Sequence, residues 1–420
     1  MDIRIEPGPL NGCVQAIASK SELHRMLICS AFAENPTGIL VSGSPYDGTH
    51  ELPDDILATI RCLRALGAGF EICAGLIRVT PVDPASKQEK PLLDCGESGS
   101  TFRFLLPVAA AFSGAATFSG AGRLPERPIT DLTDTLEKHG VSFSSRTLPF
   151  SIHGKPTGGV YEIPGNISSQ YLTGLLLMMP LLEENTQIRL TTPLVSAGYI
   201  DITTQIMGNF GVNVRCTGDI WELYENKTFT SPSALCVGGD WSNTAAFLTV
   251  SILRRDSAVL CQSLLPDSPQ GDRKILSLLE AFGAEISITD DGILTKGGNL
   301  HGTDIDIDET PDLLPVLAIA ACAVQGTTQF TNAARLRLKE SDRIESVAGL
   351  IRDLGGTAET AADSLTVHGT GFLRGGTVNA ANDHRIVMAA AIAASLCEGP
   401  VMIQGAERSE EHTSELQSRI

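Results

Sequence analysis

Cationic and hydroxyl side chains stand at the starts of several apolar segments, where helices usually begin with apolar residues or simple caps. The first such group is Ser19-Lys20-Ser21, with Arg25 about one helical turn further on. The free N–H groups and partial positive charge of a helix N-terminus attract anions. The group therefore indicates a phosphate or carboxylate site, although an exposed capping turn with solvated charges explains it better when it is taken alone.

Three further segments combine access to the backbone with hydrogen-bonding side chains. Gly96-Glu97-Ser98-Gly99-Ser100-Thr101-Phe102-Arg103 has two glycines that let a ligand approach the backbone, but no lysine follows the second glycine as in a Walker loop. Ser168-Ser169-Gln170 offers two hydroxyls and an amide. Arg127-Pro128 places an arginine beside a helix start, because proline favours the first helical position. Each segment also fits an ordinary capping turn or a surface arginine.

The densest charge lies in Lys339-Glu340-Ser341-Asp342-Arg343 and Asn382-Asp383-His384-Arg385. Either segment fits a salt-bridged surface turn, and Asp312 fits a plain preference for acids at helix starts. Taken together, seven cations at corresponding helix starts predict concentrated positive charge, with Asp312 and Glu340 available for proton transfer. These cations are Lys20, Arg25, Arg103, Arg127, Lys339, Arg343 and Arg385.

An internal repeat of about 72 residues must position these groups. Five helix-like segments each end in a glycine, and successive glycines are 73, 71, 72 and 72 residues apart. The pattern is typical of helices with a glycine C-cap. The glycines are Gly67, Gly140, Gly211, Gly283 and Gly355.

A second set of segments opens with polar groups and continues into almost entirely apolar sequence. A helix that is apolar on nearly every side must be buried on every side, so we predict six buried helices with polar N-terminal ends. Six units divide naturally into three plus three, with the crossing near residues 227–240. The predicted starts lie near Ser21, Ser100, Ser169, Ser242, Pro311 and His384.

Composition excludes several classes of protein. A chain of 420 residues with 42% apolar residues predicts two folded domains. Its net charge of −18 argues against nucleic acid or an anionic membrane as a partner. The longest apolar run, residues 313–324, is shorter than a membrane span, and the first residues do not resemble a signal peptide.

The ten cysteines are scattered along the chain and form no CxxC pair. This pattern predicts free thiols in a reducing compartment, and neither a zinc site nor a disulfide framework. We therefore expect a cytoplasmic protein without a bound metal.

The last residues depart from the repeat. A sixth glycine-capped helix would close near residue 427, whereas residues 408–420 are polar and contain two aliphatic side chains. We interpret 408–420 as a tail that is not native sequence.

The motifs, in their order along the chain, resemble those of the 3-phosphoshikimate 1-carboxyvinyltransferase (EPSP synthase) family from about residue 5 to about residue 407. The resemblance implies a two-domain inside-out α/β barrel with six βαβαββ repeats, three per domain, and buried parallel helices inside the sheets. Residues 1–15 and 232–408 would form one discontinuous domain and 16–231 the other. Besides the segments quoted above, the resemblance rests on Glu126-Arg127-Pro128, Tyr199-Ile200-Asp201-Ile202-Thr203 and Pro311-Asp312.

The reaction implied by this resemblance belongs to the shikimate pathway of aromatic amino acid biosynthesis. It transfers the carboxyvinyl (enolpyruvyl) group of phosphoenolpyruvate to the 5-hydroxyl of shikimate 3-phosphate and releases phosphate, by addition followed by elimination. It needs an acid, a base and positive charge, and it implies no metal or organic cofactor. We expect a monomer that acts on these two small molecules.

The resemblance also assigns site residues. Asp312 would act as the base on the 5-hydroxyl, Glu340 would exchange the proton at the methylene carbon, and Lys20 would assist; His384 would lie beside the reacting centre. Gly99 resembles the glycine of members that the herbicide glyphosate inhibits. The residues implied for shikimate 3-phosphate are Lys20, Ser21, Arg25, Ser168, Ser169, Gln170, Ser196, Tyr199, Asp312 and Lys339. Those implied for phosphoenolpyruvate are Lys20, Gly99, Arg127, Gln170, Arg343 and Arg385.

Two alternatives stay open. The sister family that transfers the same group to UDP-N-acetylglucosamine carries a reactive cysteine near its Arg-Pro motif, but no cysteine lies around Arg127-Pro128 and Cys95 lies well upstream. A catalytically impaired, binding-only chain is the other alternative. The family has a further lysine in a Lys-Ser-Tyr-Pro segment, whereas no lysine follows Lys339 here, so we expect weak phosphoenolpyruvate binding and reduced activity and stability.

Overall fold

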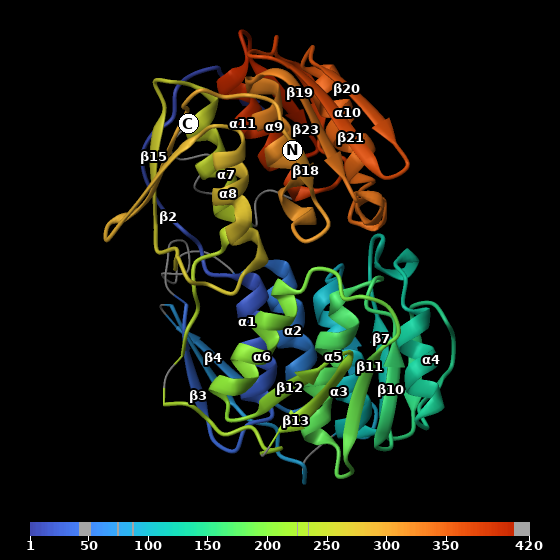
Figure 1. The fold of residues 1–420 in the computed structure, drawn as a ribbon. Coiled ribbons are helices and arrows are strands. Elements are labelled where there is room, and N and C mark those ends of the chain that lie inside the picture. Colours follow the sequence, from blue (N-terminus) through green and yellow to red (C-terminus); the bar gives the residue numbers. More distant parts are fainter. Residues whose placement is uncertain (42–51, 74, 86–87, 225, 234, 407–420) are drawn as a thin grey trace. The chain divides into compact units, whose positions relative to one another are not determined.

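The computed structural model describes residues 1–41, 52–73, 75–85, 88–224, 226–233 and 235–406. The proposed tail and the expected sixth glycine-capped helix lie outside the described residues. Contacts divide the described chain into two compact units, which comprise residues 1–17 with 238–406 and residues 18–41 with 52–237 (Figure 1). The domain boundaries expected after residues 15 and 231 stay a prediction, because a division by contacts does not identify units that fold alone.

The repeat of residues 92–153 shows the order of strands and helices that recurs along the chain. A strand leads into a buried central helix, a second strand parallel to the first leads into an outer helix, and an antiparallel hairpin completes a four-stranded sheet of order β6-β7-β9-β8. Parallel strands need such a helical crossover. The elements are β6 (Leu92–Asp94), α3 (Gly99–Ser113), β7 (Ala115–Ser119), η1 (Leu124–Glu126), α4 (Thr130–Lys138), β8 (Ser142–Phe143) and β9 (Phe150–His153).

The unit of residues 18–237 contains two further repeats of this kind. The first comprises α1 (Lys20–Ala31), β3 (Thr37–Leu40), α2 (Asp54–Ala65), β4 (Gly69–Cys73) and β5 (Leu76–Thr80). The other comprises β10 (Gly159–Ile163), α5 (Ser169–Met178), η2 (Met179–Leu181), β11 (Thr186–Leu190), α6 (Gly198–Asn209), β12 (Asn213–Thr217) and β13 (Ile220–Tyr224), followed by β14 (Leu235–Cys236).

The second unit repeats the pattern. It begins with β1 (Ile3–Ile5) and β2 (Asn11–Gln15) and continues with α7 (Trp241–Leu253), β15 (Ala258–Gln262), η3 (Gly271–Lys274), α8 (Ile275–Ala281), β16 (Glu285–Thr289) and β17 (Gly292–Lys296). The next repeat comprises β18 (Asp304–Asp306), η4 (Pro311–Leu313), α9 (Leu314–Ala323), β19 (Gln325–Thr331), η5 (Ala334–Leu338), α10 (Arg343–Asp353), β20 (Thr357–Ala361) and β21 (Ser364–Thr370). The last described elements are β22 (Gly376–Asn379), α11 (His384–Ala393), η6 (Ala394–Leu396) and β23 (Val401–Gln404).

Two strands pair with partner strands that are distant in the sequence. β2, which precedes α1, pairs in parallel with β15, and β14, which precedes α7, pairs in parallel with β3. Each of these strands therefore completes a sheet in the unit that the chain is about to leave. β1 closes the last sheet by pairing antiparallel with β23.

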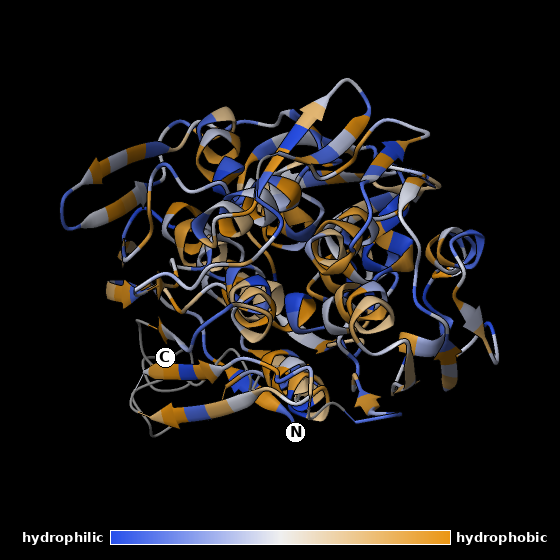
Figure 2. Cartoon of the chain, turned by 90° about the horizontal axis from the view of Figure 1, so that it is seen from below, coloured by the Kyte–Doolittle hydropathy of each residue, from blue (hydrophilic) through white to orange (hydrophobic). Residues whose placement is uncertain are grey.

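The central helices form the core, as their sequences predict. Every residue of α9 except its last is buried, and α7, α9 and α11 contact one another. Figure 2 shows that hydrophobic residues predominate in the helices viewed end-on. Apolar side chains on every face account for this complete burial. Among the described residues, no helix has the length and hydropathy needed to span a membrane.

The helix ends also follow the sequence. The five predicted glycines lie directly after α2, α4, α6, α8 and α10, with φ between 77° and 107°. Only glycine adopts such angles without a steric penalty, so these positions end the helices. Side-chain oxygens cap five central helices at their N-termini, and η4 precedes the sixth, α9. The capping residues are Ser19, Ser98, Ser168, Asp240 and Asp383.

Candidate active site

Lys20 is the first residue of α1. Its Nζ lies 3.5 Å from Oδ2 of Asp55 in the first turn of α2, and its side chain is largely buried. Ser19 caps the same helix by accepting a hydrogen bond from the Glu22 N–H. The ammonium group is therefore oriented by a neighbouring helix, next to a helix N-terminus that also favours anions.

Arg25 is a buried cation that donates hydrogen bonds to four uncharged oxygens. Burial lowers its pKa to about 10, so it stays charged at neutral pH. Its guanidinium also lies over the Phe104 ring at 4.8 Å. The acceptors are Thr203 Oγ1 (2.7 Å), Thr173 Oγ1 (3.3 Å), Tyr199 O (3.0 Å) and Ser21 O (2.6 Å). A buried positive charge held by neutral groups favours the binding of an anion.

The backbone at Gly99 faces two guanidinium groups. A Cβ atom at Gly99 would lie 2.8 Å from Nη1 of Arg127 and 3.0 Å from Nη1 of Arg103. Arg103 donates to Oε1 of Gln170 at 2.7 Å, and Gln170 donates to Oγ of Ser100 at 2.9 Å. These contacts join the starts of α3 and α5 and bring three of the expected site residues together.

The remaining expected residues of this unit lie at or just before the starts of α5 and α6. Ser168 accepts a hydrogen bond from the Gln170 N–H at 3.3 Å, and Ser169 is buried. Ser196 is buried with φ of 54°, and its carbonyl accepts from the Tyr199 N–H at 3.2 Å. Serine hydroxyl groups therefore lie at or just before the N-terminal ends of both helices.

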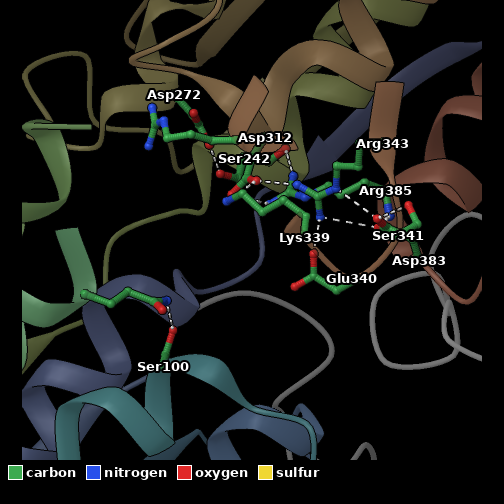
Figure 3. Close-up of polar contacts among 12 residues, drawn as sticks. Ser100, Ser242, Asp272, Asp312, Lys339, Glu340, Ser341, Arg343, Asp383 and Arg385 are labelled. Atoms are coloured by element: carbon green, nitrogen blue, oxygen red, sulfur yellow. Dashed lines mark hydrogen bonds and ion pairs between the residues drawn. The ribbon is translucent and has the colours of Figure 1, made fainter. Parts of the chain in front are cut away.

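In the second unit, Arg343 binds three carboxylates (Figure 3). Its Nη1 lies 2.5 Å from Asp312, its Nη2 2.7 Å from Glu340 and its Nε 2.9 Å from Asp383. Burial alone would lower the pKa of Arg343, but these carboxylates raise it well above its usual range. The guanidinium is therefore a permanent cation that orients all three acidic groups.

Asp312 lies in η4, just before α9. Lys339 Nζ is 3.4 Å from its Oδ1, and Arg385 Nη2 is 4.0 Å from its Oδ2. Burial by itself raises the pKa of this carboxyl, but the cations Lys339, Arg343 and Arg385 lower it well below its usual range. Asp312 is therefore ionised in the structure.

Glu340 and His384 complete the expected residues of this unit. Glu340 is partly exposed and bound to Arg343. His384 is the first residue of α11 and is partly exposed. Burial raises the pKa of the neighbouring Asp383, but the charge of Arg343 outweighs burial and lowers it. The arrangement places an ionised carboxylate and a second, more exposed carboxylate on one guanidinium, which suits paired proton transfers.

Sequence reasoning assigned no role to two buried acids of this group. Asp383 accepts from Ser341 Oγ at 3.0 Å as well as from Arg343, and it lay inside a motif already recognised as charge-dense. Asp272 accepts a hydrogen bond from Ser242 Oγ, and burial raises its pKa to about 6. The sequence around Asp272 gave no signal, because a single acid after Gln-Gly resembles any surface loop.

The charge distribution differs between the two units. The sequence predicts positive charge at all these helix starts, but Lys339, Arg343 and Arg385 lie among carboxylates. In the other unit, Arg25 and Arg103 donate hydrogen bonds to uncharged oxygens. The first group therefore combines proton-transfer groups with cations, whereas Arg25 and Arg103 are suited to holding anions.

Comparisons with known proteins agree with this chemistry. The sequence model of EPSP synthase (3-phosphoshikimate 1-carboxyvinyltransferase) matches residues 5–411. The chain is 36% identical to 3-phosphoshikimate 1-carboxyvinyltransferase of Clostridium kluyveri, over 96% of this chain and 93% of that protein. It is 34% identical to the protein of the same name from Methanocorpusculum labreanum, over 97% and 94% of the two chains. The structure of EPSP synthase from Acinetobacter baumannii matches all of this chain and 98% of its own, with a TM-score of 0.81 and 25% identity.

Proposed function

The chain belongs to the EPSP synthase family, and from this premise we propose how its own residues carry out the family's reaction. It is a transferase of the shikimate pathway that moves the carboxyvinyl group of phosphoenolpyruvate to the 5-hydroxyl of shikimate 3-phosphate and releases phosphate. Its fold is the two-domain α/β fold of that family. A cytoplasmic location and a monomeric state remain part of the proposal.

Shikimate 3-phosphate is assigned to the hydroxyl-rich helix starts. The buried Arg25 and the Ser168 and Ser169 hydroxyls offer a charge and donors to its phosphate. A polyol ring needs side chains that both donate and accept, which hydroxyls and amides provide. The full set for this substrate is Lys20, Ser21, Arg25, Ser168, Ser169, Gln170, Ser196, Tyr199, Asp312 and Lys339.

Phosphoenolpyruvate is assigned to the cations at these helix starts. Its carboxylate suits Arg343 and Arg385, because arginine can donate two coplanar hydrogen bonds to a carboxylate. Its phosphate suits Lys20, Arg127 and Gln170, together with the buried backbone at Gly99, which lies beside Arg127. Neither set of donors requires a metal ion to neutralise the substrate.

The observation that carries the catalytic part of the proposal is that one guanidinium, that of Arg343, holds both Asp312 and Glu340. In the addition step the 5-oxygen forms a bond to C2 of phosphoenolpyruvate, while Asp312 takes the proton of the 5-hydroxyl and Glu340, assisted by Lys20, gives a proton to the methylene carbon. In the elimination step the bond between C2 and the phosphate oxygen breaks, Glu340 takes a proton back from the methyl carbon, and Asp312 returns its proton to the departing phosphate. His384 lies beside this centre.

Substrate binding must also activate Asp312. In the structure three cations lower its pKa, which makes a carboxylate a weak base. The carboxylate of phosphoenolpyruvate competes for Arg343 and Arg385, and a second negative charge beside Asp312 raises its pKa again. The base therefore becomes effective when the anionic substrate is present.

Measuring phosphate release from phosphoenolpyruvate tests the function directly. We expect release with shikimate 3-phosphate as acceptor and none with UDP-N-acetylglucosamine. Turnover with the nucleotide sugar instead would support the sister enzyme, and binding of both substrates without release would support an impaired chain. The family and relatives matched above favour neither alternative.

Gly99→Ala should weaken phosphoenolpyruvate binding selectively. The new methyl group would lie 2.8 Å from Arg127 and 3.0 Å from Arg103, so both guanidinium groups must move. A displaced anion-binding group costs about 1–3 kcal/mol, so we expect KM for phosphoenolpyruvate to rise about tenfold or more. KM for shikimate 3-phosphate should change by less than about twofold, and glyphosate should compete with phosphoenolpyruvate in the parent protein. Equal KM values for phosphoenolpyruvate in parent and variant would contradict this assignment.

A further inference from the structure

We propose that His24 is a positioning residue for phosphoenolpyruvate binding, because a buried chain of hydrogen bonds runs from its imidazole through α2 to the start of α3. The inference rests on the proposed function, since this chain positions Gly99, which is assigned to phosphoenolpyruvate alone, and Lys20, which is assigned to both substrates. His24 itself has no role in the reaction described above.

Two contacts, one helical turn apart, join α1 to α2. Lys20 and His24 lie four residues apart on α1, and Asp55 and Thr59 lie four residues apart on α2, so each pair shares a helix face. Lys20 Nζ lies 3.5 Å from Asp55, and His24 Nδ1 lies 2.7 Å from Thr59 Oγ1. The His24–Thr59 contact is fully enclosed. It therefore fixes the register of α1 against α2 at which Lys20 meets Asp55.

The chain of hydroxyls continues to α3. Thr59 Oγ1 lies 2.7 Å from Thr101 Oγ1, which donates to Ser98 Oγ at 2.8 Å. Ser98 is the N-cap of α3 and accepts from the Thr101 N–H. Gly99 is the next residue, so the chain of hydrogen bonds ends beside the buried backbone that faces Arg127 and Arg103.

The main-chain oxygen of Asp55 is an alternative acceptor for two members of this chain, since each hydroxyl has one proton to donate. The hydroxyls of Thr59 and Thr101 lie 3.3 and 3.2 Å from the main-chain oxygen of Asp55. All three hydroxyl-bearing residues, Thr59, Thr101 and Ser98, are buried. Buried hydrogen-bonded networks are costly to break, because water cannot replace a lost partner. Loss of one member should therefore be transmitted to its neighbours.

The imidazole acts here as a neutral spacer. Burial lowers the pKa of His24 to about 3, with Asp55 opposing and Lys20 and Arg25 adding to the shift. The ring also meets Phe104 of α3 edge to face, with centroids 6.3 Å apart. A neutral, fixed ring sets the spacing of three helices without placing a positive charge beside Lys20.

Arg25, the next residue of α1, belongs to a separate set of contacts. It donates to Thr203 of α6 and Thr173 of α5. Arg25 itself and the residues at the starts of these two helices are assigned to shikimate 3-phosphate. The two sets use different hydroxyl groups, although His24 and Arg25 both contact the Phe104 ring. Disturbing one of them should therefore affect the binding of one substrate more than that of the other.

The test compares His24→Phe with His24→Asn. Phenylalanine keeps the ring but removes the hydrogen bond to Thr59, so we expect KM for phosphoenolpyruvate to rise about tenfold, the factor that corresponds to about 1.4 kcal/mol. KM for shikimate 3-phosphate should rise less than KM for phosphoenolpyruvate, because Lys20 is assigned to both substrates but Gly99 to phosphoenolpyruvate alone. The asparagine amide can occupy the place of Nδ1, so His24→Asn should recover most of the phosphoenolpyruvate affinity.

Two further variants make the test specific. Thr59→Val removes the middle hydroxyl with little change in shape, so the double variant with His24→Phe should be no worse than the poorer single variant. Thr203→Val is the matched control, because it removes the Arg25 Nε bond and should raise KM for shikimate 3-phosphate instead.

Amide hydrogen exchange provides a readout that needs no substrate. In folded His24→Phe, the amides of residues 99–101 should exchange faster than in the parent protein. Unchanged exchange there, or equal changes in both KM values, would overturn the positioning role. A parent protein that releases no phosphate from its two substrates would contradict the proposed function, while the exchange result would still decide the role of His24.

Discussion

Asp312→Asn should lower kcat by about 1,000-fold, within the range of about 100- to 10,000-fold that a general base contributes. The amide keeps the size of the side chain but cannot accept the proton of the 5-hydroxyl. Arg343 still has Glu340 and Asp383 as partners, so the unit should stay folded. Shikimate 3-phosphate binding, measured by calorimetry, should persist.

The two kinetic constants for phosphoenolpyruvate should separate in this variant. In the parent, Asp312 pairs with Arg343 and Arg385, the two cations that are assigned to the substrate carboxylate. Removing its charge eliminates this competition, so KM for phosphoenolpyruvate should stay level or fall while kcat falls.

The exposed Asp290 supplies the control, and Asp290→Asn should match the parent in both constants. A kcat near the parental value in Asp312→Asn would show that another group is the base.

Local sequence signals predicted the fold well. A helix that ends in the left-handed conformation needs glycine at that position, so the signal is local. All five predicted glycines follow the ends of outer helices. The central helices begin within about three residues of their predicted starts, because apolar sequence on every face specifies burial. The fold class and the family were confirmed.

Strand pairings between segments that are distant in the sequence could not be predicted from local signals. Nothing in the short β14 indicates that it pairs with β3, almost 200 residues earlier, rather than with its neighbour β15. Strand pairing depends on which edges remain open after the nearby elements have packed. The residue pattern of one strand does not contain that information.

The candidate site shows the same limit. Lys339, Arg343 and Arg385 were identified from their types and spacing, but their surroundings were not. Arg343 finds Asp312 and Asp383 about 30 and 40 residues away in sequence. These carboxylates, which are distant in the sequence, neutralise the positive charge that the local motifs suggest. The roles assigned to these residues stay predictions.

Arg343→Met should cost both activity and stability. Arg343 is almost fully buried and neutralises three carboxylates. Removing one partner of a buried ion pair leaves an uncompensated charge, which typically costs about 3–5 kcal/mol. The free energy of unfolding in urea should fall by about that amount, and kcat/KM should fall at least about 1,000-fold, because the base, the second acid and the substrate carboxylate all lose their common partner.

Arg343→Lys separates charge from geometry. Lysine keeps the positive charge but cannot donate to three carboxylates from one plane. We therefore expect most of the stability to return while kcat/KM stays about 100-fold or more below the parent. The neighbouring Arg337 is the matched control: it pairs with Asp342 and Glu345 near the surface, where such pairs contribute at most about 1 kcal/mol. Arg337→Lys should therefore change both measurements little. If Arg343→Lys restored activity as fully as stability, charge alone would suffice and the orientation of Asp312 and Glu340 by one guanidinium would not matter for the reaction.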